Sequence, residues 1–76
     1  MNAVHIRTDG MYCDKCPHRI EECLEHLSGV KAARAFSDMH LTSVLYDAER
    51  IGPEAICNEI ASEGFSARVV ARTLTY

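Results

Sequence analysis

Two cysteines three positions apart, Cys13 and Cys16, are the residues of this sequence best suited to chemistry. In a loop, residues at this spacing can bring both sulfurs to one point, as a soft metal ion or a redox disulfide requires. Pro17 follows directly, and proline suits the first turn of a helix, where a missing N–H costs nothing. A thiol near a helix N-terminus is stabilised as the thiolate, which is the form that binds metal. The segment therefore favours metal ligation or thiol chemistry.

The composition of the chain limits the classes of protein to which this cysteine pair can belong. The 76 residues predict a single domain over 1–76, and the net charge is −3, with acidic and basic residues mixed along the chain. The sequence has neither a basic stripe for nucleic acid nor the ~20 apolar residues that cross a bilayer. Four cysteines would suit a small secreted disulfide domain. Because the N-terminus lacks the apolar centre of a signal peptide, we instead expect a cytoplasmic protein with reduced thiols.

Hydropathy patterns predict the elements that position the pair. Alternation of apolar and polar residues indicates strands over 3–8, 30–36, 41–46 and 66–71, followed by a loose tail over 72–76. In the last strand, Ala67, Val69 and Ala71 are expected on one face. Apolar spacings of three and four indicate helices from Pro17 to Leu27 and from Pro53 to about residue 63. This order predicts an α+β, ferredoxin-like plait, with a four-stranded antiparallel sheet and both helices on one face.

Motifs along these predicted strands and helices resemble those of the heavy-metal-associated domain, a family of copper chaperones and N-terminal modules of metal-transporting P-type ATPases. The resemblance covers about residues 3–71 and rests on Gly10-Met11-x-Cys13-x-x-Cys16, Ile20-Glu21-x-x-Leu24-x-x-Leu27-x-Gly29-Val30, Val44-x-Tyr46-Asp47 and Glu63-Gly64-Phe65-x-Ala67. It implies that Cys13 and Cys16 bind one metal ion, usually Cu(I). It also implies that Met11 is buried beneath the loop and that Phe65 stands close to it.

The residues around the pair leave the metal open. The two thiolates have no histidine or carboxylate at a spacing that would let it join them, so they form a sulfur site of low coordination number. Such a site suits Cu(I) better than Zn(II), because Zn(II) prefers about four ligands. Tyr12 stands where the family usually has threonine and where Zn(II)- and Cd(II)-selective members often have aspartate. A proline directly after the second cysteine, here Pro17, resembles the pattern of the exported Hg(II)-binding members. Asp14 is a candidate oxygen ligand for a harder ion or a helix N-terminal acid, and Lys15 can offset the charge of the thiolates.

The other sulfur and imidazole groups are expected outside the site. Cys23 lies two helical turns beyond Cys16, about 10 Å along the axis, and is expected to pack half-buried, as is Cys57. His18 is expected on the surface. Met39, in the hairpin turn, is expected at the end of the plait far from the cysteine loop.

These residues predict a domain that binds and carries a soft metal ion. The sequence shows no set of residues suited to enzymatic hydrolysis or group transfer, so we do not expect an enzyme. A partner with a similar two-cysteine site, either a P-type ATPase domain or a metallochaperone, would take the ion by thiolate exchange through a three-sulfur intermediate. A homodimer bridged by one metal through four cysteines is a further option. The competing interpretations are Hg(II) or Zn(II)/Cd(II) detoxification, a thiol–disulfide redox module, and a docking module that has lost metal binding.

Overall fold

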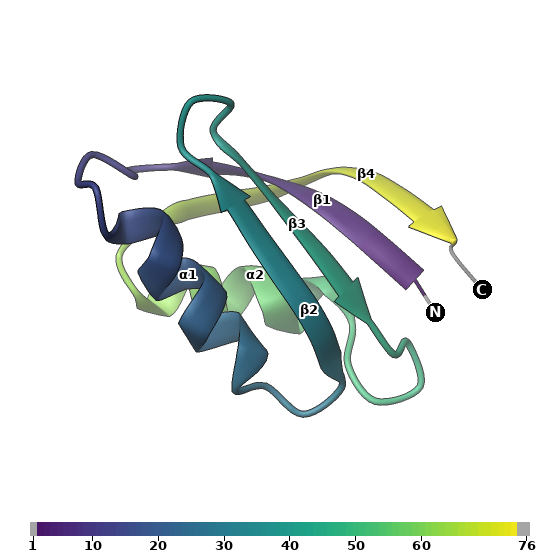
Figure 1. Cartoon of the computed structure of the whole chain (residues 1–76). Helices are drawn as coiled ribbons and strands as arrows, with labels where there is room; N and C mark the ends of the chain where they lie inside the picture. Colours follow the sequence, from purple (N-terminus) through teal and green to yellow (C-terminus); the bar gives the residue numbers. More distant parts are fainter. Residues whose placement is uncertain (1, 75–76) are drawn as a thin grey trace.

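The structure, a computed structural model, describes residues 2–74. Its elements are β1 (Asn2–Asp9), α1 (Cys16–Glu25), β2 (Val30–Phe36), β3 (Leu41–Tyr46), α2 (Pro53–Ser62) and β4 (Ser66–Leu74). The strands form one antiparallel sheet in the order β2-β3-β1-β4. Figure 1 shows both helices on the same face of this sheet, which confirms the predicted ferredoxin-like plait. Within residues 2–74, neither helix has the length and hydropathy that crossing a membrane requires.

The core lies between the sheet and the two helices. Alternation along the strands turns one set of apolar side chains toward the helices, and spacings of four along each helix turn another set toward the sheet. The side chains that meet there are at most 2% exposed: Val4, Ile6, Val44, Tyr46, Ile20, Leu24, Ile56 and Ile60. Burial of one such side chain is worth about 1.5–3 kcal/mol, so this layer is the main source of stability in a small domain.

Two threonine side chains are fully buried at the edge of this layer. The Thr8 hydroxyl donates to the carbonyl oxygen of Ile6 at 3.2 Å, and its oxygen lies 2.9 Å from the hydroxyl of Thr42. Because Thr8 gives its hydrogen to Ile6, it is Thr42 that donates to Thr8. The hydrogen bond of Thr42 therefore depends on Thr8, whereas Thr8 has a second partner.

Replacement of Thr8 by valine is expected to lower the free energy of unfolding by about 1–3 kcal/mol, because it leaves the Thr42 hydroxyl buried without a partner. Thr42→Val should cost less, since Thr8 still donates to Ile6. The double variant should be more stable than Thr8→Val alone, because both buried hydroxyls are gone. Urea denaturation of the four proteins measures these values. Equal single costs that add in the double variant would contradict the shared hydrogen bond.

β4 is longer than the sequence pattern predicts. It continues to Leu74, and Arg72 pairs with Val4 of β1. The prediction of a loose tail from residue 72 is therefore wrong for residues 72–74, while 75 and 76 lie outside the described residues. Pairing with β1 explains the difference, because backbone hydrogen bonds to a neighbouring strand do not require an apolar alternation.

β4 also contains an irregularity that the pattern does not reveal. His5 pairs with Ala71 and Ile6 with Val69, so Val70 is an extra residue opposite β1. Residues paired across a sheet share a face, and such a bulge shifts the alternation by one. Ala71 therefore lies with His5 on the open face and Val69 with Ile6 on the helix face. The prediction that Val69 and Ala71 share a face is wrong.

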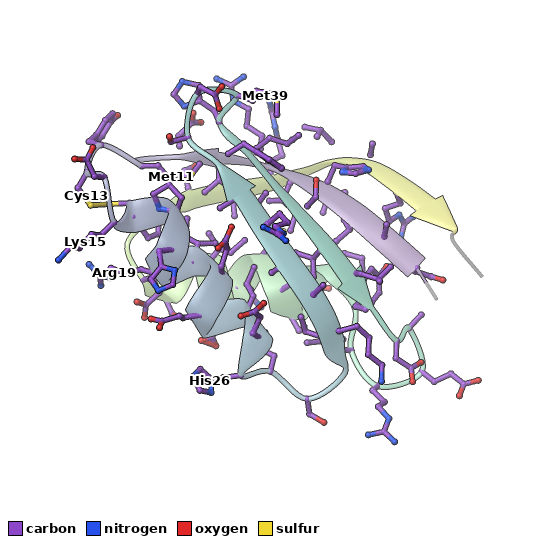
Figure 2. All side chains as sticks on the ribbon, in the orientation of Figure 1. Met11, Cys13, Lys15, Arg19, His26 and Met39 are labelled. Carbon is purple, nitrogen blue, oxygen red and sulfur yellow. A yellow bond between two sulfur atoms is a disulfide. The ribbon has the colours of Figure 1, made fainter. Side chains whose placement is uncertain are left out.

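The turn between β2 and β3 lies beside the end of β1. The N–H of Thr8 donates to the carbonyl oxygen of His40 at 2.8 Å, and His40 Nδ1 lies 3.7 Å from Asp9 Oδ1. Figure 2 shows Met39, in this turn, at the same end of the molecule as Cys13. The prediction that Met39 lies at the far end is wrong, because antiparallel pairing places the start of β3 beside the end of β1.

Candidate metal centre

The segment 10–16, here called the metal loop, joins the end of β1 to the start of α1. Two backbone hydrogen bonds fold it: the N–H of Tyr12 donates to the carbonyl oxygen of Gly10 at 2.9 Å, and the N–H of Cys16 donates to that of Cys13 at 3.2 Å. Lys15 is the N-cap of α1, and Pro17 lies in the first turn, as predicted. The start of the helix therefore positions one of the two cysteines.

The metal loop brings Cys13 and Cys16 together. Their Cα atoms are 5.3 Å apart, and their sulfurs form a disulfide, visible in Figure 2 beside the N-terminal end of α1. Cys16 is only 8% exposed and belongs to the hydrophobic core, whereas Cys13 is exposed. Reduction of the bond gives two neighbouring thiols on a short loop, a donor set that suits a soft ion of low coordination number. Solvent and other proteins have access to this donor set from the side of Cys13.

Two apolar side chains support the metal loop from the core. Met11 is 7% exposed and Phe65 is 8% exposed, and both belong to the same core cluster as Cys16. Phe65 packs so closely against the loop that a Cβ atom added at Gly10 would lie 3.3 Å from its ring. The buried position of Met11 and the place of Phe65 beside the loop, both implied by the family resemblance, are confirmed. The conformation of the loop is therefore coupled to the core.

No further donor joins the two cysteines. Over residues 2–74, no three side chains of cysteine, histidine, aspartate or glutamate are arranged so that they could hold a metal ion. Asp14, the candidate oxygen ligand, is exposed in the metal loop, and the neighbouring Lys15 is also exposed. His18 is on the surface as predicted, 3.3 Å from Glu22. The arrangement can therefore supply two sulfur ligands.

The other two cysteines are free, half-buried thiols, as predicted. Cys23 of α1 donates to the carboxylate of Glu59 on α2 at 3.3 Å. Burial, followed by this hydrogen bond and the charges of Glu59 and Glu63, raises the pKa of Cys23 from 9.0 to about 11. Burial also raises the pKa of Cys57. Both thiols are therefore protonated at neutral pH. The contact between Cys23 and Glu59 joins residues 36 positions apart, and no sequence spacing indicates it.

Alkylation is expected to reveal the protonated state of Cys23. When the pH is below the pKa of a thiol, its thiolate fraction falls about tenfold for each pH unit of difference. Because the pKa of Cys23 is about 11, iodoacetamide at pH 8 should modify Cys23 about a hundredfold more slowly than a thiol with a pKa of 9.0. The measurement uses the Cys13→Ser/Cys16→Ser variant and mass-spectrometric peptide mapping. Glu59→Gln should speed the reaction, because it removes the negative charge. The same variant unfolded in urea is the reference, and equal rates in both states would contradict the prediction.

Comparison with known proteins places these features in one family. The sequence model of the heavy-metal-associated domain matches residues 5–66. The copper chaperone CopZ of Staphylococcus haemolyticus is 32% identical over 63 residues, which are 83% of this chain and 93% of the chaperone. The copper-exporting P-type ATPase of Mycobacterium tuberculosis is 33% identical over 64 residues, which are 84% of this chain and 8% of the ATPase.

Solved structures share the fold. A copper binding domain from a P-type ATPase superposes with a TM-score of 0.94 at 27% identity, covering 97% of this chain and all of that domain. The yeast copper transporter domain, determined in apo and Cu(I)-loaded states, superposes with a TM-score of 0.86 at 25% identity, covering 93% of this chain and 97% of that domain. Both neighbours extend over nearly all of the plait, so the segment that carries Cys13 and Cys16 lies within the shared fold.

Proposed function

Because this chain belongs to the heavy-metal-associated domain family, we propose that it binds one Cu(I) ion through Cys13 and Cys16 and passes it to a partner protein. The observation that carries the proposal is the pair itself, with one thiol anchored at the start of α1, one exposed, and no third donor grouped with them among residues 2–74. A two-sulfur site matches the softness and low coordination number of Cu(I), whereas Zn(II) and Cd(II) favour more ligands. The copper proteins among its relatives support the same choice.

Transfer requires only an exchange of ligands. An incoming thiol loses its proton and attacks the ion, a three-sulfur intermediate forms, and one of the two original thiolates leaves and takes up a proton. A second thiol of the partner then displaces the remaining thiolate in the same way, which releases the ion to the partner. The ion keeps its oxidation state, so no electron acceptor is needed. The incoming thiol has access beside exposed Cys13, whereas Cys16 is buried at the start of α1. The N-terminal end of α1 and Lys15 can offset the negative charge of the site.

The partner we propose is a P-type ATPase domain or a metallochaperone with a two-cysteine site of its own. The chain itself would bind and hand over the ion and would catalyse no reaction. A location in the cytoplasm and a homodimer bridged by metal stay predictions.

An anaerobic competition titration tests this function. The reduced protein competes with a chromogenic chelator for Cu(I), and parallel titrations use Zn(II) and Hg(II). Cys13→Ser/Cys16→Ser is the test variant, and Cys23→Ser is the matched control that removes a cysteine outside the site. One tight Cu(I) equivalent, lost only in the double variant, would support the proposal. Tight Zn(II) or Hg(II) with weak Cu(I) would move the assignment to another metal, and no tight metal would overturn it.

The disulfide between Cys13 and Cys16 favours one alternative, a thiol–disulfide redox module. In that function the reduced pair gives two electrons and two protons to a partner disulfide and becomes oxidised itself. Equilibration in glutathione redox buffers measures the reduction potential of the pair. A reduced chain with no tight metal site that readily exchanges its disulfide with glutathione would support this alternative over copper transfer.

A further inference from the structure

The two edge strands of the sheet differ in how their outer sides are occupied. β2 and β4 are the outermost strands, so alternate backbone N–H and carbonyl groups of each point away from the sheet. On β2, one of these groups is already bonded, because the N–H of Ala35 donates to the carboxylate of Glu21 on α1 at 2.9 Å. Among residues 2–74, no side chain makes such a hydrogen bond to the backbone of β4. The outer side of β4 is therefore the edge that offers its backbone groups to another strand.

A groove of about 550 Å³ lies between β4 and α2. Its apolar lining comes from both elements and consists of Pro53, Cys57, Ala67 and Val69. Val69 lies on the helix face of the sheet but is 37% exposed, so α2 leaves this part of the sheet uncovered. The extra residue of the bulge, Val70, is 50% exposed. A strand added to β4 would turn every second side chain toward this groove, which is how sheet edges recognise extended peptides.

The charged side chains of the groove are mostly positive. Arg68 and Arg72 line it and are exposed, and β4 has no acidic residue. Among residues 2–74, neither of these arginines takes part in an ion pair. The acidic side chain of the lining is Glu54, in the first turn of α2, where the helix N-terminus favours a negative charge. Arg7 of β1 lies opposite Arg68 and is paired with Asp9. A chain of net charge −3 therefore has a groove with two positive side chains and one negative.

The charges of both edge strands argue against a second copy of this chain as the occupant. The other edge strand, β2, has Lys31 and Arg34 and, like β4, no acidic residue. Pairing of β4 with either edge strand of another copy would bring positive side chains together, and like charges opposite each other destabilise a sheet. An acidic strand would instead place negative side chains beside Arg68 and Arg72. The groove therefore fits an acidic segment of a different protein.

We propose that the outer edge of β4 and the groove beside it bind an extended, acidic segment of another protein, which joins the sheet as an additional strand. Backbone hydrogen bonds to β4 hold the segment, and its small apolar side chains enter the groove against Val69 and Cys57. Its acidic side chains pair with Arg68 and Arg72. None of the residues that line the groove belongs to the metal loop, so this interaction does not depend on the proposed transfer of Cu(I).

An NMR titration of the metal-free, isotope-labelled full chain tests this proposal. The probe is a short capped peptide in which valine and glutamate alternate. Amide shifts should change in β4 and in the first turn of α2, and amide hydrogens of β4 should exchange more slowly when the peptide is bound. Arg68→Glu/Arg72→Glu should weaken binding by at least about tenfold, because it reverses both charges. Arg34→Glu, which reverses an exposed charge on the other edge strand, is the matched control and should bind the peptide like the wild type.

A second peptide, with lysine in place of glutamate, separates strand addition from general attraction between charges. The variant with both charges reversed should bind the lysine peptide in preference to the glutamate peptide, at the same amides of β4. If that variant does not fold, Arg68→Gln/Arg72→Gln takes its place in the comparison with the glutamate peptide. No binding of the glutamate peptide at millimolar concentration would overturn the proposal. So would equal losses in the β4 and β2 variants, or binding without slower exchange in β4. Because no metal is present, none of these results bears on the proposed function.

Discussion

Oxidation of Cys13 and Cys16 to the disulfide is expected to weaken Cu(I) binding by at least about a thousandfold relative to the reduced protein. The thiolate is the metal ligand, and the disulfide leaves neither sulfur with a negative charge to give. Residues 2–74 offer no group of three metal-binding side chains that could take over. In the disulfide-bonded state, the proposed site therefore has no thiolate to offer.

The measurement is the chelator competition carried out on three samples: the air-oxidised protein, the same sample after reduction with a phosphine, and a sample kept reduced throughout. The phosphine supplies two electrons and water the two protons, so binding should return to the level of the third sample. Cys23→Ser, treated in the same way, serves as the control, because Cys23 lies outside the site. Competition by the oxidised protein as strong as that of the reduced protein would contradict the two-thiolate site.

Replacement of Gly29 by alanine is expected to lower the free energy of unfolding by about 2–5 kcal/mol, the largest stability effect that we predict. Gly29 has a φ angle of +97°, which residues other than glycine rarely adopt, and this strain accounts for about 1–2 kcal/mol. A Cβ atom there would also lie 2.8 Å from Cβ of Arg50 and 3.0 Å from Cγ2 of Ile51. Relief of that overlap requires the loop after β3 to move, at a further cost of about 1–3 kcal/mol.

The chain contains a matched control for the Gly29 prediction. Gly64 has a φ angle of +96°, but a Cβ atom there would meet nothing within 4 Å. Gly64→Ala should therefore cost only about 1–2 kcal/mol, which is the backbone term alone. Urea denaturation of both variants and the wild type, all in the same redox state, gives the two values. If both variants were equally destabilised, the close packing of Gly29 against Arg50 and Ile51 would not contribute.

Local patterns in the sequence predict most of this fold and the centre of the site. The bounds of β2 and β3 agree with the prediction, because apolar alternation and turn residues define a hairpin within a short segment. Cys13, Cys16 and Pro17 lie within one loop and one helical turn, so their proximity also follows from local spacing.

Features that depend on pairing between distant segments could not be predicted in this way. The extra residue Val70 in β4 is defined only by its alignment with β1. The place of Met39 beside the metal loop depends on the register of β1 against β3, and the contact between Cys23 and Glu59 depends on how two helices pack. Each of these relationships involves residues far apart in the sequence, where the period of one segment carries no information about the other.

The unequal exposure of Cys13 and Cys16 affects the order in which a donor and an acceptor of the ion can bind to the domain. In the proposed transfer, the exposed cysteine is Cys13, so a protein that delivers the ion and a protein that collects it would approach the same side of the site, one after the other. Donor and acceptor then compete for the domain, and an excess of either one slows the overall flow. Nothing in this arrangement fixes a direction, so under the proposed function the relative affinities and concentrations of the two partners would decide which way the ion travels.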